Sequence, residues 1–226
     1  MSFFKPCQTG EIYHVFNKSI EKFKIFNSAA EYQRVIETMI YYQYTDIDSP
    51  YSTFINSAFI QTSGFINGLH AIYKNSPKYV QLIAYCIMPT HFHIIIKQNS
   101  DNGIATFLRK WLNSYSRYFN LKHKRKGPLW SHHYKRVHIT SDTQLLHETR
   151  YVHLNPTTNY LVSSPEEWKY SSFGEYIQPY KGRRRLCEFD EFIGMSPREY
   201  RRFVIEHIAE QREMKEIQHA LANFGS

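Results

Sequence analysis

The sequence predicts an α+β fold in which helices back an antiparallel sheet, close to the ferredoxin-like arrangement. Two observations carry this prediction. Strand patterns and helix patterns follow one another in the order strand, helix, hairpin, helix, strand, helix. The two central strand patterns are separated by one short turn, which suits an antiparallel pair. With 226 residues, 42% of them apolar, the chain can form one domain with its own core and an appendage.

The first strand and the first helix are predicted from two different hydrophobic periods. Residues 11–19 follow the period-two pattern of a strand, with His14 on the same face as two apolar residues. Residues 29–42 repeat apolar side chains at helical spacing, and Asn27 or Ser28 can cap that helix. We therefore expect a strand followed directly by an amphipathic helix.

Residues 78–89 and 91–98 are predicted to form the hairpin, joined by a Pro-Thr turn. Successive strand side chains point to opposite faces, so His91 and His93 share one face and the apolar residues around them form the other. Two neighbouring imidazoles are candidate metal ligands. The chain contains 12 His, so chance supplies on the order of half an expected His-x-His pair, and the pair alone does not establish a site.

The next elements are a long amphipathic helix over 104–120 and a strand over 134–140. A further helix is opened by the capping-box pattern at Ser141. We expect this helix to end near Asn155, because that residue precedes a proline and is biased away from helix.

We predict one domain over residues 1–180. Within it, residues from about 43 to 77 lose regular periodicity, and we interpret them as an insertion with room for one short helix. Residues 181–226 are predicted to be a tail, in which a basic linker over 180–185 leads to one helix after Pro197.

Positive charge is abundant and unevenly distributed. The formal net charge of +8 favours a polyanionic partner, nucleic acid first and an anionic membrane surface second. Between Asn102 and Ser141 there is no Asp or Glu but nine of the 28 Lys and Arg residues, interleaved with aromatic residues. Cations neutralise phosphates and aromatic rings stack on unpaired bases, which indicates single-stranded nucleic acid. A basic face over an aromatic core stripe is the structural alternative. The candidate DNA-binding residues are Arg109, Lys110, Arg117, Lys122, Lys124, Arg125, Lys126, Trp130, Lys135 and Arg136.

Cysteine usage and hydropathy predict a cytoplasmic protein. Cys7, Cys86 and Cys187 are odd in number and far apart, which argues against disulfides and a zinc knuckle. No apolar run has the length of a membrane span, and the first residues lack the pattern of a signal peptide. We therefore expect no membrane partner.

Tyr151 and Asn155 are candidates for the rest of a reactive site. They are four residues apart, so they share one face of the predicted helix. The Asn155 carbonyl oxygen could join His91 and His93 in a ligand set with positions open for a phosphate oxygen and water. Imidazole and oxygen donors suit Mn²⁺ or Mg²⁺, with zinc as an alternative. The Tyr151 phenolate could then attack phosphorus. Because the chain has 18 Tyr, packing is the competing role.

Three blocks of sequence resemble the IS200-like (Y1) transposases, and most closely their branch associated with repetitive extragenic palindromes (REP). The blocks are YCIMPTHFHIII, GPLWSHHYKRVHI and RYVHLNPTTNYLVSSPEEWKYSSFGEY, and YHVFNKSIEKFKIF also fits the family's first strand. The resemblance covers roughly residues 10–42 and 78–180. It implies the HUH endonuclease fold, named for a His-hydrophobic-His metal motif that falls on His91 and His93.

The resemblance also implies an activity. Tyr151 falls on the family's catalytic tyrosine and Asn155 on its third metal ligand, where other members use Gln. A Mg²⁺- or Mn²⁺-dependent enzyme would cut single-stranded DNA beside a hairpin, form a 5′-phosphotyrosine and later rejoin strands, acting as a monomer or homodimer. Two alternatives stay open: a domesticated hairpin-binding protein with weak catalysis, and a zinc hydrolase that uses His91 and His93.

Overall fold

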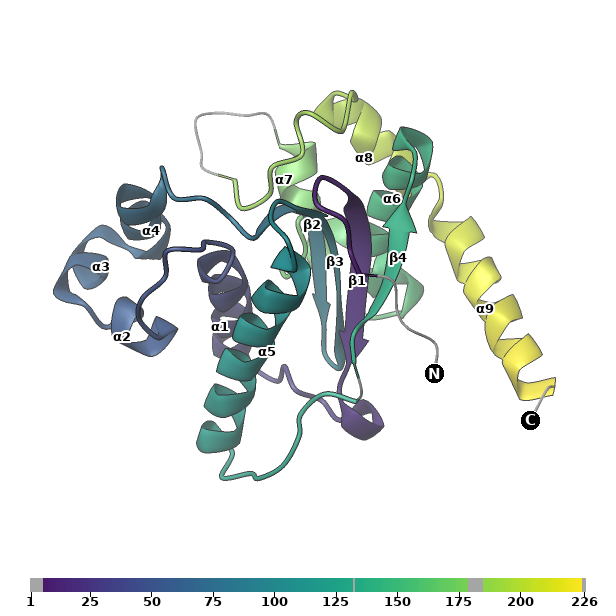
Figure 1. Cartoon of the computed structure of the whole chain (residues 1–226). Coiled ribbons are helices and arrows are strands. Elements are labelled where there is room, and N and C mark those ends of the chain that lie inside the picture. The colour runs from purple at the N-terminus through teal and green to yellow at the C-terminus, as the bar shows by residue number, and fades with distance from the viewer. Residues whose placement is uncertain (1–5, 132, 179–184, 225–226) are drawn as a thin grey trace.

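The structure is a computed structural model that describes residues 6–131, 133–178 and 185–224. Figure 1 shows a central sheet with helices on both faces, a group of short helices at one side and helix α9 at the other. The described residues include no helix long and apolar enough to span a membrane.

Within the described part of the chain, the sheet contains β1 (Ile12–Lys18), β2 (Val80–Met88), β3 (His91–Gln98) and β4 (Lys135–Ile139). The strand order is β2-β3-β1-β4, and every neighbouring pair is antiparallel. The first strand therefore lies between the hairpin and the last strand, which is the ferredoxin-like order. The predicted α+β class is confirmed.

One face of the sheet packs against helix α5 (Gly103–Lys122), which in turn packs against α1 (Ala29–Tyr41). The ring of Trp111 on α5 lies 4.7 Å from that of Phe92 on β3, between centroids, and its Nε1 donates to the Val35 carbonyl of α1 at 2.9 Å. The apolar face of the predicted hairpin is thus the main core, and α5 is the amphipathic helix that the sequence predicts.

The other face is covered by α6 (Asp142–Thr158). Ser141 caps this helix by accepting from the Gln144 amide at 3.2 Å. The expected end near Asn155 is wrong, because the helix continues through the proline to Thr158. The proline removes only one backbone donor. The turn after it is still held, because the Asn159 amide donates to the Asn155 carbonyl at 3.0 Å and the Thr157 and Thr158 hydroxyls donate to the Leu154 carbonyl at 2.8 and 2.9 Å.

The predicted insertion contains three short helices, α2 (Tyr51–Ile55), α3 (Ala58–Ser63) and α4 (Phe65–Tyr73), so the expectation of one helix is wrong. Gly64, with φ of 78°, separates α3 from α4. Aromatic rings around Tyr41 of α1 bind the group to the core. A pattern rich in aromatic residues and poor in charge concealed these helices, because each is too short to show a period.

The C-terminal region forms two helices where one was expected, α8 (Pro197–Ile205) and α9 (Ile208–Phe224). The His207 ring bonds the Phe203 carbonyl through Nδ1 at 2.7 Å, which is the acceptor that the His207 amide would use in a continuous helix. That amide bonds the Val204 carbonyl instead. Both helices pack against α6. Residues 180–184 of the expected linker lie outside the described residues.

The remaining short elements are the 3-10 turns η1 (Ile20–Lys22) and η2 (Pro165–Glu167) and helix α7 (Phe173–Ile177). Helix α7 packs against α8 and η2, and none of the three elements lines the cavity described next.

Candidate active site

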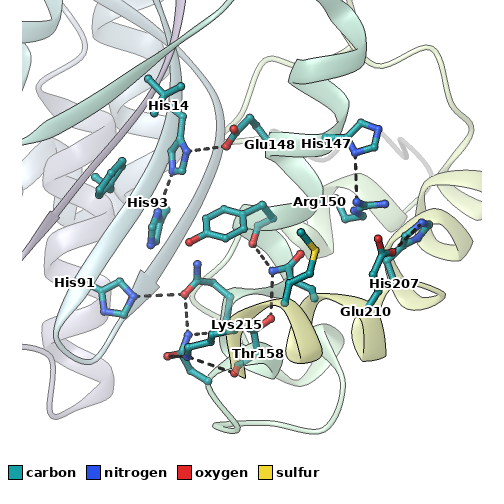
Figure 2. Close-up of a pocket in the computed structure, with 17 residues that line it drawn as sticks. His14, His91, His93, His147, Glu148, Arg150, Thr158, His207, Glu210 and Lys215 are labelled. Atoms are coloured by element: carbon teal, nitrogen blue, oxygen red, sulfur yellow. Dashed lines mark hydrogen bonds and ion pairs between the residues drawn. The ribbon is translucent and has the colours of Figure 1, made fainter. Parts of the chain in front are cut away.

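A cavity of about 560 Å³ lies between the sheet and helices α6 and α9, and Figure 2 shows the side chains that line it. The structure brings four sequence-predicted residues together on its wall: His91, His93, Tyr151 and Asn155. The two histidines come from the start of β3, and the other two come from α6.

The two histidine rings are neighbours just after the hairpin turn, with centroids 5.3 Å apart and ring planes at 86° to each other. Nδ1 of His91 bonds the Thr90 hydroxyl at 3.1 Å, and Nε2 of His91 lies 3.4 Å from Oδ1 of Asn155. Asn159 orients that amide by donating to the same Oδ1 at 2.9 Å.

Both imidazoles are neutral at ordinary pH. Burial lowers the pKa of His91, and the charge of Lys215 lowers it further against the opposing hydrogen bond with Asn155. Burial, with the neighbouring His14 and His91 rings, holds the pKa of His93 well below its usual range. A neutral imidazole keeps one lone pair, which is what a metal ligand requires.

The donor set fits a divalent cation. Ligands about 2.1 Å from one ion lie about 3.0 to 3.4 Å apart at octahedral to tetrahedral angles, and the His91–Asn155 distance is 3.4 Å. No group of three His, Cys, Asp or Glu side chains suited to a metal ion occurs among the described residues. The predicted third ligand beside His91 and His93 is the Asn155 amide oxygen, the acceptor that faces Nε2 of His91.

Tyr151 projects from α6 toward the histidines. Its ring centroid lies 5.5 Å from that of His93 and 5.8 Å from that of His14, and the side chain is 41% exposed. Burial of the hydroxyl raises its pKa, Glu148 adds to this, and a hydrogen bond with Asn155 opposes it. The group is therefore a phenol at neutral pH and is open to a substrate.

Sequence reasoning missed several cavity residues. Nε2 of His14 bonds Nδ1 of His93 at 2.9 Å, and Nδ1 of His14 lies 2.8 Å from the Glu148 carboxylate. The alternation over residues 11–19 placed His14 on one face, but nothing in the sequence indicated the register that sets it beside His93. Lys215 of α9 also lines the cavity and donates to Oδ1 of Asn159 at 2.6 Å.

The basic candidates on α5 lie on the helix that covers the opposite face of the sheet. Arg109 and Arg117 are exposed there, and Lys110 donates to the Tyr79 hydroxyl at 3.3 Å. Lys122 forms an ion pair with Glu31 of α1 at 2.8 Å. The acid-free window in the sequence is therefore partly neutralised in space by an acid from another helix.

Three basic candidates lie in the loop after α5, whose far end meets the sheet beside the strand that carries the histidine pair. Lys124, Arg125 and Lys126 begin the loop that returns to β4, and the Ser131 amide of that loop donates to the Lys18 carbonyl at 2.9 Å. Lys18 pairs with His91 in the sheet. The loop and the histidine pair therefore share one end of the sheet.

The last three candidates are placed differently. The ring of Trp130 packs against that of Phe92, at 5.5 Å between centroids, and its N–H donates to the Ser116 hydroxyl at 3.0 Å. Trp130 is therefore mainly a packing residue. Lys135 is exposed on β4, and Arg136 donates to the Cys7 sulfur at 2.8 Å.

Residues 66–155 match the family model described as "Transposase IS200 like". This segment is similar to the IS200-like transposases. The IS200-like segment runs from α4 to α6 and contains the His pair, Tyr151 and Asn155, whereas β1 with His14 and helices α8 and α9 lie outside it. The family implies a DNA-cleaving enzyme and generally uses a divalent metal.

The fold agrees with this assignment. A solved structure described as a REP-associated tyrosine transposase bound to a REP hairpin matches with a TM-score of 0.51 and 14% identity, covering 86% of this chain and 99% of that chain. No curated protein matches the chain. The resemblance to IS200-like transposases is confirmed, and the roles of individual residues stay predictions.

Proposed function

We propose that the protein is a transposase and endonuclease that cleaves and rejoins single-stranded DNA next to a hairpin through a 5′-phosphotyrosine. The observation that carries the proposal is the convergence of one tyrosine hydroxyl, two neutral imidazoles and one amide oxygen on a single open cavity. The IS200-like segment supports it, because that segment contains all four residues.

Each residue has a distinct part in the proposed reaction. His91, His93 and Asn155 would hold Mg²⁺ or Mn²⁺, which when bound polarises the scissile phosphate. The Tyr151 oxygen forms a bond to phosphorus as the bond from phosphorus to the 3′ oxygen breaks. The phenol loses one proton and the departing 3′ oxygen gains one. Since the phosphodiester is conserved on tyrosine, the reverse step rejoins strands without ATP.

The proposed path of the DNA follows the charge at the hairpin end of the sheet. Lys124, Arg125, Lys126 and Lys135 belong to segments that meet the His91 end of the sheet, so phosphates bound there are led toward Tyr151. Arg109 and Arg117 face the other side and would contact only DNA that wraps around α5. The partner is single-stranded or hairpin DNA, bound by a monomer or a homodimer.

The proposed catalytic unit of residues 1–180 is completed by the tail. Helix α9 forms part of the cavity wall through Glu210, Gln211, Met214 and Lys215. We therefore regard residues 181–226 as a second unit that closes the site of the first.

Covalent capture tests the proposal. The protein is incubated with Mn²⁺ and a pool of hairpin oligonucleotides that carry randomised single-stranded flanks, and the products are separated under denaturing conditions. A 3′ label should migrate with the protein, because the 5′ phosphate of the downstream piece stays on tyrosine. A 5′ label should appear on a free fragment that ends in a 3′-hydroxyl.

The same experiment separates the alternatives. Hairpin binding without an adduct would identify a non-cleaving DNA-binding protein and contradict the proposal. A zinc hydrolase would give neither an adduct nor hairpin binding.

A further inference from the structure

Three hydrogen-bonded side chains form a line that ends on a candidate metal ligand. It runs from Glu148 on α6 through His14 on β1 to His93 on β3 (Figure 2). The Glu148 carboxylate is 2.8 Å from Nδ1 of His14, and Nε2 of His14 is 2.9 Å from Nδ1 of His93. The two histidines are 4% and 7% exposed. Water therefore has little access to the bond between the two rings.

The chemistry of the three groups restricts where the ring protons can be. A carboxylate only accepts hydrogen bonds, and a neutral imidazole donates from one nitrogen and accepts at the other. A neutral His14 next to Glu148 must carry its proton on Nδ1, which leaves Nε2 as an acceptor. The hydrogen bond to His93 then requires the proton of His93 to be on Nδ1.

We infer that Glu148 and His14 are positioning residues that fix the ring proton of His93 on Nδ1 and thereby leave Nε2 of His93 as a lone-pair donor toward a divalent cation. The inference rests on the proposed function for the cation, but the position of the proton can be measured without one.

Two further observations support the assignment. None of the described residues forms a hydrogen bond to Nε2 of His93, so that nitrogen is left for a ligand. His91 shows the same division of its ring, with Nδ1 held by the Thr90 hydroxyl and Nε2 facing Asn155. In both rings Nδ1 forms a hydrogen bond to a neighbouring protein side chain. Such outer partners orient metal-bound imidazoles and raise their basicity.

Nitrogen NMR of the metal-free protein tests the inference directly. Long-range correlation spectra of ¹⁵N-labelled protein distinguish a protonated ring nitrogen from one with a lone pair, and His14→Gln and His93→Gln variants assign the signals. We expect protons on Nδ1 of both His14 and His93. A proton on Nε2 of His93 in the wild-type protein would overturn the inference.

Glu148→Gln is the decisive variant, because an amide of nearly the same shape can donate as well as accept and so no longer dictates the tautomer of His14. We expect His93 to become a mixture of tautomers and Mn²⁺ affinity, measured by calorimetry, to fall about 10-fold. Asp142→Asn removes one charge from the exposed start of α6 and should leave both readouts unchanged.

The outcomes for the two proposals differ. An unchanged His93 tautomer and unchanged Mn²⁺ affinity in Glu148→Gln would refute the positioning role. A wild-type protein with the expected tautomers that binds no Mn²⁺ would refute the metal-dependent function, while the ring-proton assignment would be upheld. Thermal melting and hairpin binding of each variant show that it is folded.

Discussion

Nε2 of His91 lies 3.4 Å from Oδ1 of Asn155, although 64 residues separate them in the sequence. Two donors at this distance can share one ion, so each should matter to metal binding by itself. We expect Asn155→Ala and His91→Ala each to weaken Mn²⁺ affinity by at least about 10-fold and to abolish cleavage at low Mn²⁺ while hairpin binding persists. Asn113→Ala, on the exposed surface of α5, is the control. If the His91→Ala variant cleaved DNA at the wild-type rate in the presence of a chelator, the metal site would be contradicted.

Tyr151→Phe removes one oxygen and keeps the ring. Because a phenyl ring cannot attack phosphorus, the covalent adduct and strand cleavage should both disappear, while Mn²⁺ and hairpin affinities stay within about twofold. Tyr160→Phe is a matched control, since that hydroxyl is exposed and bonds Glu216 away from the histidine pair. Mass spectrometry of the trapped wild-type adduct should place the nucleotide on Tyr151, and a nucleotide on any other residue would refute the assignment.

The loop basic residues and Lys122 should differ in their effect on DNA binding. Replacing Lys124, Arg125 and Lys126 together by Ala should flatten the dependence of log affinity on log salt by about 2, since each phosphate contact on a single strand contributes roughly 0.7. Lys122→Ala should change the slope little, because Glu31 already pairs with that ammonium. Hairpin affinities measured from low to moderate salt test both. Equal effects of Lys122 and the loop residues would place the DNA on α5 instead.

Glu175 predicts a pH dependence of stability. Burial raises the pKa of this carboxyl to about 7, against the opposing hydrogen bonds from the Cys187 and Leu186 amides. A raised folded-state pKa means that the folded protein binds the proton more tightly, so its contribution is complete below about pH 4.5 and is lost as pH rises through 7. The free energy of unfolding falls by roughly 3 kcal/mol at most through this group.

Urea unfolding at pH 5, 6, 7 and 8 measures this contribution. The wild-type free energy of unfolding should fall over this range relative to that of Glu175→Gln, which carries no titrating group there. Glu188→Gln, an exposed carboxylate nearby, should follow the wild type. Parallel profiles for the wild type and Glu175→Gln would show that Glu175 is ionised at little cost.

Local patterns predicted the sheet well because each strand carries its own period, and the face shared by His91 and His93 follows from that period alone. Two of the missed pairings depended on contacts between distant residues. The pairing of His14 with His93 requires the β1–β3 register, and the pairing of Lys122 with Glu31 requires the packing of α5 on α1. The break before α9 depends on one ring-to-carbonyl bond of His207, which resembles an ordinary helical residue in the sequence.

The central place of β1 in the sheet has a consequence for biosynthesis. Both neighbours of β1 are made much later, since β3 begins at residue 91 and β4 ends at residue 139. Until β3 is made, a nascent chain carries a strand whose two edges have no partner, and one edge stays unpaired until β4 follows. Closing such long loops is slow. Unpaired strand edges invite association with other chains. The cavity should be completed later still, because helices α6 and α9, which line it, follow the last strand in the chain.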